Sequence, residues 1–94
     1  MTLSKYIYKV PGGKLLKVVV EHDNHLMHTM RITGDFFMHP EEAIEALEKE
    51  LEMCPLDKKE IEKRITQFVT KKKVTLFGVN ASAIAEAILG ASHG

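Results

Sequence analysis

Cysteine is almost absent from this sequence. Cys54 stands alone among 94 residues, so no disulfide can form within the chain, and a reducing, cytoplasmic setting is expected. No apolar run approaches the roughly 18 residues that a membrane-spanning helix needs, and no secretory signal pattern opens the chain. These absences argue against a membrane protein and against a secreted protein held together by disulfides.

An excess of either charge is also lacking. Thirteen Lys and Arg residues balance thirteen Asp and Glu residues, which gives a formal net charge of zero. Nucleic-acid-binding domains and polybasic proteins of membrane surfaces usually carry a basic excess. The balance argues against both classes. It also predicts that docking to another protein depends on shape and apolar contact more than on long-range steering.

The chain is short enough to form one domain over residues 1–94. With 45% hydrophobic and 28% charged residues, its composition is typical of a folded domain rather than a disordered one. A domain of this length buries only about 60–65% of its unfolded surface, which leaves little room for a pocket that encloses a nucleotide and a second substrate. A module that works with a partner is therefore more expected than an independent two-substrate enzyme.

Alternating apolar residues predict three antiparallel strands, at residues 5–10, 15–21 and 26–33. The connections are Pro11-Gly12-Gly13 and the polar run 22–25, and both are typical of hairpin turns. In the first strand the alternation places the two tyrosines and Val10 on one face. In the third strand it places Met27 on the face opposite Met30 and Ile32. The three segments predict a meander.

Helical spacing of apolar residues follows in three segments, at about residues 40–53, 57–73 and 80–90. Pro40 suits the first turn of the first helix, Asp57 and Asn80 suit the N-caps of the others, and Gly90 is expected to stop the third. The connection 74–79 has no clear type. Because one face of the sheet needs a cover, we predict an α+β fold in which a three-stranded antiparallel meander is followed by three helices packed on one face.

The glycine pair before Lys14 is reminiscent of a phosphate-binding loop but does not complete the motif. A P-loop needs a glycine where Tyr8 stands and a serine or threonine where Leu15 stands, and it joins a strand to a helix. A hairpin turn is the simpler interpretation. A turn that lets a partner backbone or a phosphate approach, with Lys14 as a point charge, is the alternative.

A short, very apolar segment, Phe36-Phe37-Met38, lies between Asp35 and His39. An Asp–His pair can polarise a nucleophile, but no serine or cysteine partner is indicated. Two consecutive phenylalanines cannot both point inward from an extended strand, so one of them is a candidate for contact with a partner. Cys54, which has no acidic or basic neighbour in sequence, is interpreted as a buried or semi-buried structural thiol.

Three segments resemble the C-terminal accessory domain of lipoate–protein ligases, and together they span nearly the whole chain. They are Tyr8 to Leu15 (YKVPGGKL), Arg31 to Glu42 (RITGDFFMHPEE) and Leu76 to Val79 (LFGV) followed by a short helix. The second segment is the most specific, because twelve residues in this order are hard to obtain from turn chemistry alone. In archaea such as thermoplasmas the domain exists as a separate small subunit, and this chain resembles that form.

The resemblance implies a non-catalytic small subunit that forms a heterodimer with a large catalytic ligase subunit. Such a ligase activates lipoate with ATP and Mg²⁺ to lipoyl-adenylate. It then transfers the lipoyl group to a lysine of an acceptor protein, such as a 2-oxoacid dehydrogenase E2 domain or a glycine-cleavage H protein. The accessory domain is implied to serve the adenylation step, with ATP, Mg²⁺ and lipoate bound by the complex and no cofactor held by this chain alone.

The resemblance also implies which residues face the catalytic subunit, with Phe36 or Phe37 as an apolar anchor. The first and second matching segments supply these candidates: Lys9, Gly12, Gly13, Lys14, Gly34, Asp35, Phe36, Phe37 and His39. A direct contact between Lys14 and a phosphate is a further hypothesis.

Two alternatives from other classes remain open. The first is a free-standing binding module for sulfur or iron–sulfur transfer, which a single cysteine makes poor. The second is a metal-binding protein that uses His22, His25 and His28 to hold zinc or nickel. Metal binding needs imidazoles that converge on one point, and exposed histidines on a hairpin are the simpler interpretation.

Overall fold

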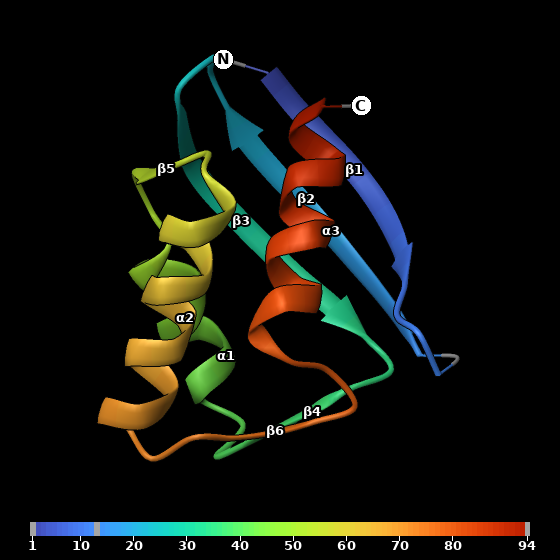
Figure 1. Ribbon diagram of the computed structural model, residues 1–94, viewed down its shortest axis with the longest axis vertical. Helices are drawn as coiled ribbons and strands as arrows, with labels where there is room; N and C mark the ends of the chain where they lie inside the picture. The colour runs from blue at the N-terminus through green and yellow to red at the C-terminus, as the bar shows by residue number, and fades with distance from the viewer. Residues whose placement is uncertain (1, 13, 94) are drawn as a thin grey trace.

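The computed structural model of the chain describes residues 2–12 and 14–93. Its main antiparallel sheet has the order β1-β2-β3-β5, formed by β1 (Thr2–Lys9), β2 (Leu15–His22), β3 (Leu26–Gly34) and β5 (Cys54–Pro55). A separate two-stranded ribbon pairs β4 (Phe37–His39) with β6 (Thr75–Phe77). The helices are α1 (Ala43–Glu50), α2 (Lys58–Lys71) and α3 (Ala81–His93), as Figure 1 shows.

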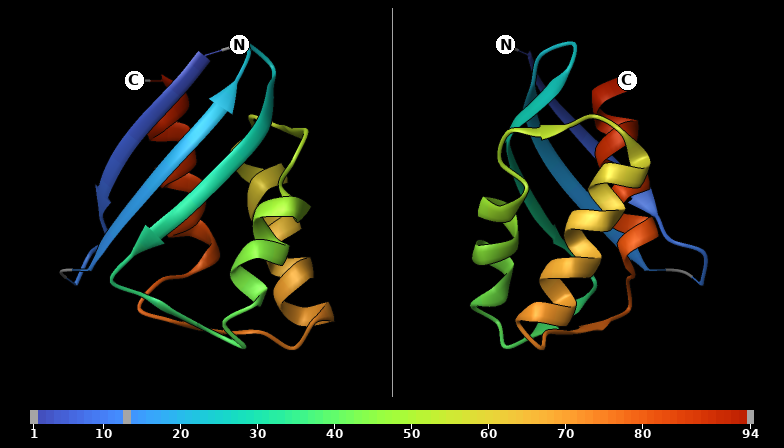
Figure 2. Two further views of the ribbon diagram at one scale, coloured as in Figure 1. Left: turned by 180° about the vertical axis from the view of Figure 1, so that it is seen from behind. Right: turned by 60° about the vertical axis from the view of Figure 1, so that its left-hand side comes forward.

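All three helices lie on one face of the main sheet, which Figure 2 shows from behind with the strands in front. Helix α3 packs over β1 and β2, α1 packs against β3, and α2 packs against both helices. The predicted α+β meander with three helices on one face is therefore confirmed. The β5 strand and the β4–β6 ribbon were not predicted, because strands of two or three residues are too short to show an alternation.

The pleat of the sheet decides which strand residues are buried. Leu16, Val18 and Val20 of β2 point toward the helices and are fully buried, whereas the residues between them face away. Tyr6 and Tyr8 of β1 share one face, as predicted, and in the structure this is the helix side. Their stacked ring centroids lie 6.5 Å apart. The two faces of the sheet therefore differ sharply in composition.

Strand β3 departs from a simple alternation. Glu21 pairs with Thr29, but the next residue, His22, pairs with Met27, so His28 is the extra residue of a β-bulge. The bulge turns Met27 inward, where it is fully buried. The prediction that Met27 faces away from Met30 was wrong, because an alternation read from sequence does not anticipate an inserted residue.

Helices α2 and α3 start where a side chain accepts a backbone N–H of the first turn. An Asp57 carboxylate oxygen accepts the backbone N–H of Glu60 at 3.0 Å, and Asn80 Oδ1 accepts that of Ala83 at 2.8 Å, which confirms both predicted caps. The first helix starts later than predicted. The Pro40 carbonyl accepts the N–H of Ala43 in a turn, and α1 begins only at Ala43.

Gly90 does not stop the third helix, as we had predicted, but lies inside it. A Cβ built on Gly90 would lie 2.5 Å from a ring carbon of Tyr6 on β1. The glycine therefore lets α3 approach the sheet closely, and tertiary packing outweighs its low helix propensity.

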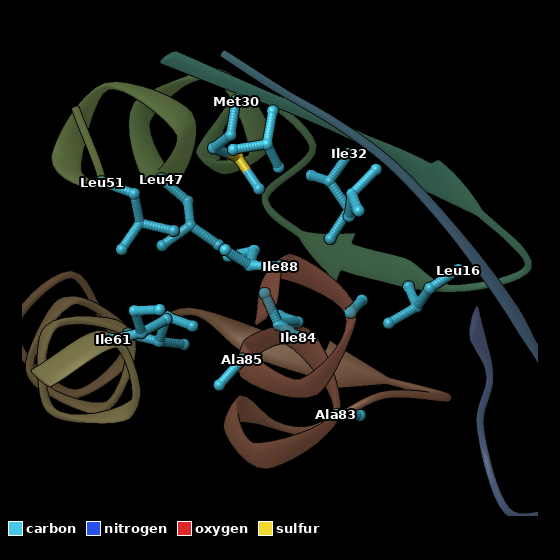
Figure 3. Close-up of a cluster of buried hydrophobic side chains, with 14 of the residues drawn as sticks. Leu16, Met30, Ile32, Leu47, Leu51, Ile61, Ala83, Ile84, Ala85 and Ile88 are labelled. Carbon is cyan, nitrogen blue, oxygen red and sulfur yellow. The ribbon is translucent and has the colours of Figure 1, made fainter. Parts of the chain in front are cut away.

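The core fills the space between the sheet and the helices. Figure 3 shows Leu16, Met30 and Ile32 of the sheet pointing toward Ile84 and Ile88 of α3. Leu47 of α1, Leu51 at the C-cap of α1 and Ile61 of α2 close the cluster, and all of these side chains are buried. Helix α1 is also tied to the sheet by a hydrogen bond, in which the Glu48 carboxylate accepts the N–H of Ile32 at 2.9 Å.

Candidate functional site

The β4–β6 ribbon lies at one end of the molecule, beyond the end of β3 (Figure 1). Phe37 pairs with Phe77 across the ribbon, so the two rings share a face. Phe37 is 73% exposed and Phe77 is 53% exposed, whereas Met38, on the opposite face, is buried. Phe36, just before the ribbon, is only 8% exposed. The expectation that one of the two consecutive phenylalanines faces outward is thus met by Phe37.

The turn between β1 and β2 lies next to this ribbon. The N–H of Val10 donates to the Lys14 carbonyl at 2.7 Å and closes the turn, in which Gly12 has a φ of +107°. Lys9 is paired with Leu15 at the start of the hairpin, and both residues are exposed, as is Lys14. Gly13, also a predicted site residue, lies outside the described residues.

Gly34 and Asp35 fit against the same hairpin. The N–H of Asp35 donates to the Leu15 carbonyl at 2.9 Å. Gly34 has a φ of +146°, and a Cβ there would collide with the Leu15 carbonyl oxygen. A glycine is therefore required at position 34 both for its backbone conformation and for its contact with β2.

Gly78 brings the third segment into contact with the other two. A Cβ built on Gly78 would lie 3.2 Å from the Asp35 carbonyl oxygen and 3.7 Å from Lys14 Cγ. Residues far apart in the sequence are therefore neighbours at one end of the molecule. We call this surface the ribbon end, and it comprises Lys14, Leu15, Gly34, Asp35, Phe37, His39, Phe77 and Gly78.

The exposed rings of Phe37 and Phe77 are the main apolar feature of the ribbon end. No hydrogen bond joins Asp35 to His39 within the described residues, and His39 instead follows Phe37 on the exposed face, paired with Thr75. Two exposed rings beside glycine-containing turns give an apolar surface that a partner backbone can approach closely. Phe77 was not among the predicted site residues. The third matching segment, Leu76 to Val79, contains Phe77 and is the sequence signal that could have found it.

The three histidines do not converge on one point. His22 is buried, with Nε2 3.1 Å from Ser4 Oγ, so it is not the exposed hairpin residue of the simpler interpretation. His28 Nε2 lies 2.8 Å from an Asp23 carboxylate oxygen on the exposed turn. The described part of the chain holds no group of three His, Cys, Asp or Glu side chains placed to bind a metal ion.

The Asp23 carboxylate organises that turn. Its Oδ1 accepts the backbone N–H groups of His25 and Leu26 at 2.7 and 2.8 Å. These bonds, with the contact to His28, hold the pKa of Asp23 well below its usual range, because they favour the charged form. This turn lies at the end of the sheet opposite the ribbon end (Figure 1).

Cys54 is a buried structural thiol, as predicted. Its Sγ lies 3.4 Å from the Pro55 carbonyl oxygen, and burial raises the pKa of the thiol. A raised pKa disfavours the reactive thiolate, so this cysteine gives the sulfur-transfer alternative no support.

Comparisons with known proteins agree on one family. The model of the family described as the C-terminus of bacterial lipoate protein ligases matches residues 7–88. The search of curated protein sequences found no match. No helix in the described residues is long and apolar enough to cross a membrane.

A solved structure has the same fold. It is a structure of an archaeal lipoylation system from Thermoplasma acidophilum, with a bipartite lipoate protein ligase and its E2 lipoyl domain. One of its chains superimposes with a TM-score of 0.74 at 26% identity, over 93% of this chain and 94% of that one. The family match covers most of the chain and leaves out the first part of β1 and the end of α3. This chain therefore belongs to the family of lipoate protein ligase C-terminal domains.

Proposed function

We propose that this chain is the non-catalytic accessory subunit of a bipartite lipoate protein ligase and that the catalytic subunit needs it to form lipoyl-adenylate. The family match supports a role in lipoate ligation, and the structural match is to a bipartite ligase. The observation that carries the proposal is the convergence, at the ribbon end, of the three segments that resemble the accessory domain.

In the proposed reaction the carboxylate of lipoate attacks the α-phosphate of ATP, which releases pyrophosphate and leaves lipoyl-adenylate. The acceptor lysine then attacks the activated carbonyl and releases AMP. ATP and lipoate are the substrates and Mg²⁺ is the metal ion that accompanies ATP, and the catalytic subunit would hold all three. A docked accessory subunit can promote the first step by ordering the loops of that subunit around both substrates and excluding water.

The ribbon end is the surface that we assign to this docking. Exposed aromatic rings supply large contact areas at a small loss of side-chain entropy, and such rings dominate the binding energy of many interfaces. Phe37 is the anchor, because it is the more exposed ring, and Phe77 supports it from the paired strand. Phe36 is buried and instead holds the ribbon against the core.

The test is lipoyl-adenylate formation by the purified catalytic subunit, with and without this chain. We expect adenylate to accumulate at a substantial rate only when both chains are present, and this chain alone to turn over no ATP. A separate assay supplies the catalytic subunit with synthetic lipoyl-adenylate and follows transfer to the acceptor. Equal adenylate formation with and without the chain would contradict the proposal.

A further inference from the structure

The face of the main sheet that points away from the helices is uncovered in the described structure (Figure 2). Its residues are those that alternate with the buried ones on β1, β2 and β3. We call it the open face, and it consists of Leu3, Lys5, Ile7, Lys9, Leu15, Lys17, Val19, Glu21, Thr29, Arg31 and Thr33. Leu3 and Ile7 are among its most exposed members, at 64% and 65%.

The open face is strongly unbalanced in charge. The face carries Lys5, Lys9, Lys17 and Arg31 and a single carboxylate, that of Glu21. Because Arg31 lies beside Glu48 of α1, the three lysines against Glu21 leave a surplus of two positive charges in a chain whose formal net charge is zero. Among the described residues, no carboxylate lies within ion-pair distance of Lys5, Lys9 or Lys17. Arg31 lies nearer to acids, with Nη1 3.9 Å from a Glu48 carboxylate oxygen, and it lines a surface pocket with Glu45, Glu48 and Glu52.

Cations and aliphatic side chains alternate across this face. One row of the register places Lys5 beside Val19 and Arg31, and the next places Ile7 beside Lys17 and Thr33. Each exposed aliphatic side chain is thus flanked by a positive charge. A partner that covers this face must place apolar groups against the aliphatic side chains and negative groups against the cations.

We propose that the open face binds an acidic surface of the catalytic ligase subunit and that its charges set the rate at which the two subunits associate. This inference rests on the proposed function, because the partner that it names is the catalytic subunit of the proposed ligase. Leu15 links the two surfaces, since it belongs to both the open face and the ribbon end. One partner can therefore cover both surfaces at once.

Charge and chemistry argue against other occupants. Two copies packed through their open faces would bring two positive surpluses to about 10 Å, close to the Debye length of physiological salt, where they repel each other. A single-stranded nucleic acid needs aromatic rings on which bases stack, and Tyr6 and Tyr8 point to the other face of the sheet. An anionic lipid surface is the remaining competitor, and the test below includes it.

The test compares two double variants. Lys5→Gln with Lys17→Gln removes two charges from the open face, and Lys59→Gln with Lys63→Gln removes two exposed charges from α2 as a matched control. Association and dissociation rates with the catalytic subunit are measured from low ionic strength to about 1 M salt. Circular dichroism checks that both variants keep the fold.

We expect the open-face variant to associate roughly 10-fold more slowly than wild type at low salt, and equally fast at high salt, because steering is screened. The control variant should keep the wild-type rate. Adenylate formation at saturating concentration should be unchanged in the control variant. Equal association rates for the two variants, while wild type still stimulates adenylation, would overturn this inference alone.

A second arm tests the competitors. Wild-type chain is mixed with vesicles of phosphatidylserine and, separately, analysed for self-association by sedimentation. We expect no binding to the vesicles at physiological salt and no dimer. The proposal would be contradicted if wild type bound vesicles or formed a dimer and the open-face variant did not. The proposed function itself would be contradicted if wild type failed to bind the catalytic subunit.

Discussion

The ribbon end and the open face are both uncovered surfaces, yet they are built in different ways. The ribbon end takes its shape from turns, and glycines at positions 34 and 78 let three chain segments meet. The open face takes its character from the pleat of the sheet, which collects the lysines of two strands on one side. The first offers two aromatic rings, and the second offers charges among aliphatic side chains. We infer that the first holds a partner and the second attracts it.

The largest expected effect is a loss of folding stability when the backbone of the ribbon end is altered. Gly34→Ala places a Cβ against the Leu15 carbonyl at a φ of +146°, and we expect a loss of about 3 kcal/mol or more in the free energy of unfolding. Gly12→Ala is the control, because that glycine has a positive φ but nothing within 4 Å of its added Cβ. Urea denaturation measures both. Equal losses for the two variants would show that the contact with β2 is unimportant.

The next effect distinguishes a surface that slows dissociation of the complex from a surface that speeds its association. Phe37→Ser removes the most exposed ring of the ribbon end, and we expect the complex with the catalytic subunit to weaken by about 2 kcal/mol, roughly 30-fold in Kd. The change should appear in the dissociation rate and should persist at high salt. Met53→Ala, an exposed apolar residue beyond the other end of α1, is the control. If only the association rate changed, the ribbon end would attract the partner without holding it, which would contradict the roles assigned to the two surfaces.

A smaller effect concerns the turn at the far end of the sheet. The pKa of Asp23 is lowered on folding, so its contribution to stability is present above the pKa of an unfolded aspartate, about 4, and is lost as the pH falls below it. Asp23→Asn should therefore have a weaker dependence of unfolding free energy on pH below about 4. Binding to the catalytic subunit should not change, because the turn belongs to neither surface. Identical pH profiles for variant and wild type would contradict this account of the turn.

The smallest effect is expected at Lys14, an exposed charge beside the hairpin turn. Lys14→Ala should slow association by less than about 3-fold, as is usual for a charge at the rim of an interface. The KM of the complex for ATP should stay the same. A large rise in that KM would instead favour a direct contact between Lys14 and a phosphate, which was the alternative that the glycine pair suggested.

Much of this fold could be predicted from the sequence, because its main strands and helices show strong periodicity and clear caps such as Asp57 and Asn80. Met27 could not be placed, since a bulge at His28 reverses the alternation. Gly90 was misread because its neighbour, Tyr6, is far away in the sequence. In each case a shift in strand register or a contact between residues far apart in the sequence outweighed the local sequence pattern.

The candidate site was predictable only in part. Phe37, the turn residues and Phe77 all stand in segments that resemble the family, but the pairing of Phe77 with Phe37 could not be predicted from a strand of only three residues. The net charge of zero did not indicate how the charges are placed. The fold gathers four cations on one face of the sheet, and the prediction that steering is weak stays a prediction. Total charge says nothing about how topology distributes it.

The most direct test of the central claim is a titration of the catalytic subunit with this chain, with lipoyl-adenylate formation as the readout. Wild type and a Phe37→Ser, Phe77→Ser double variant are compared. We predict that wild type raises adenylate formation to a plateau and that the variant reaches the same plateau only at a much higher concentration. A wild-type titration that produces no stimulation, or two superimposable curves, would contradict the account.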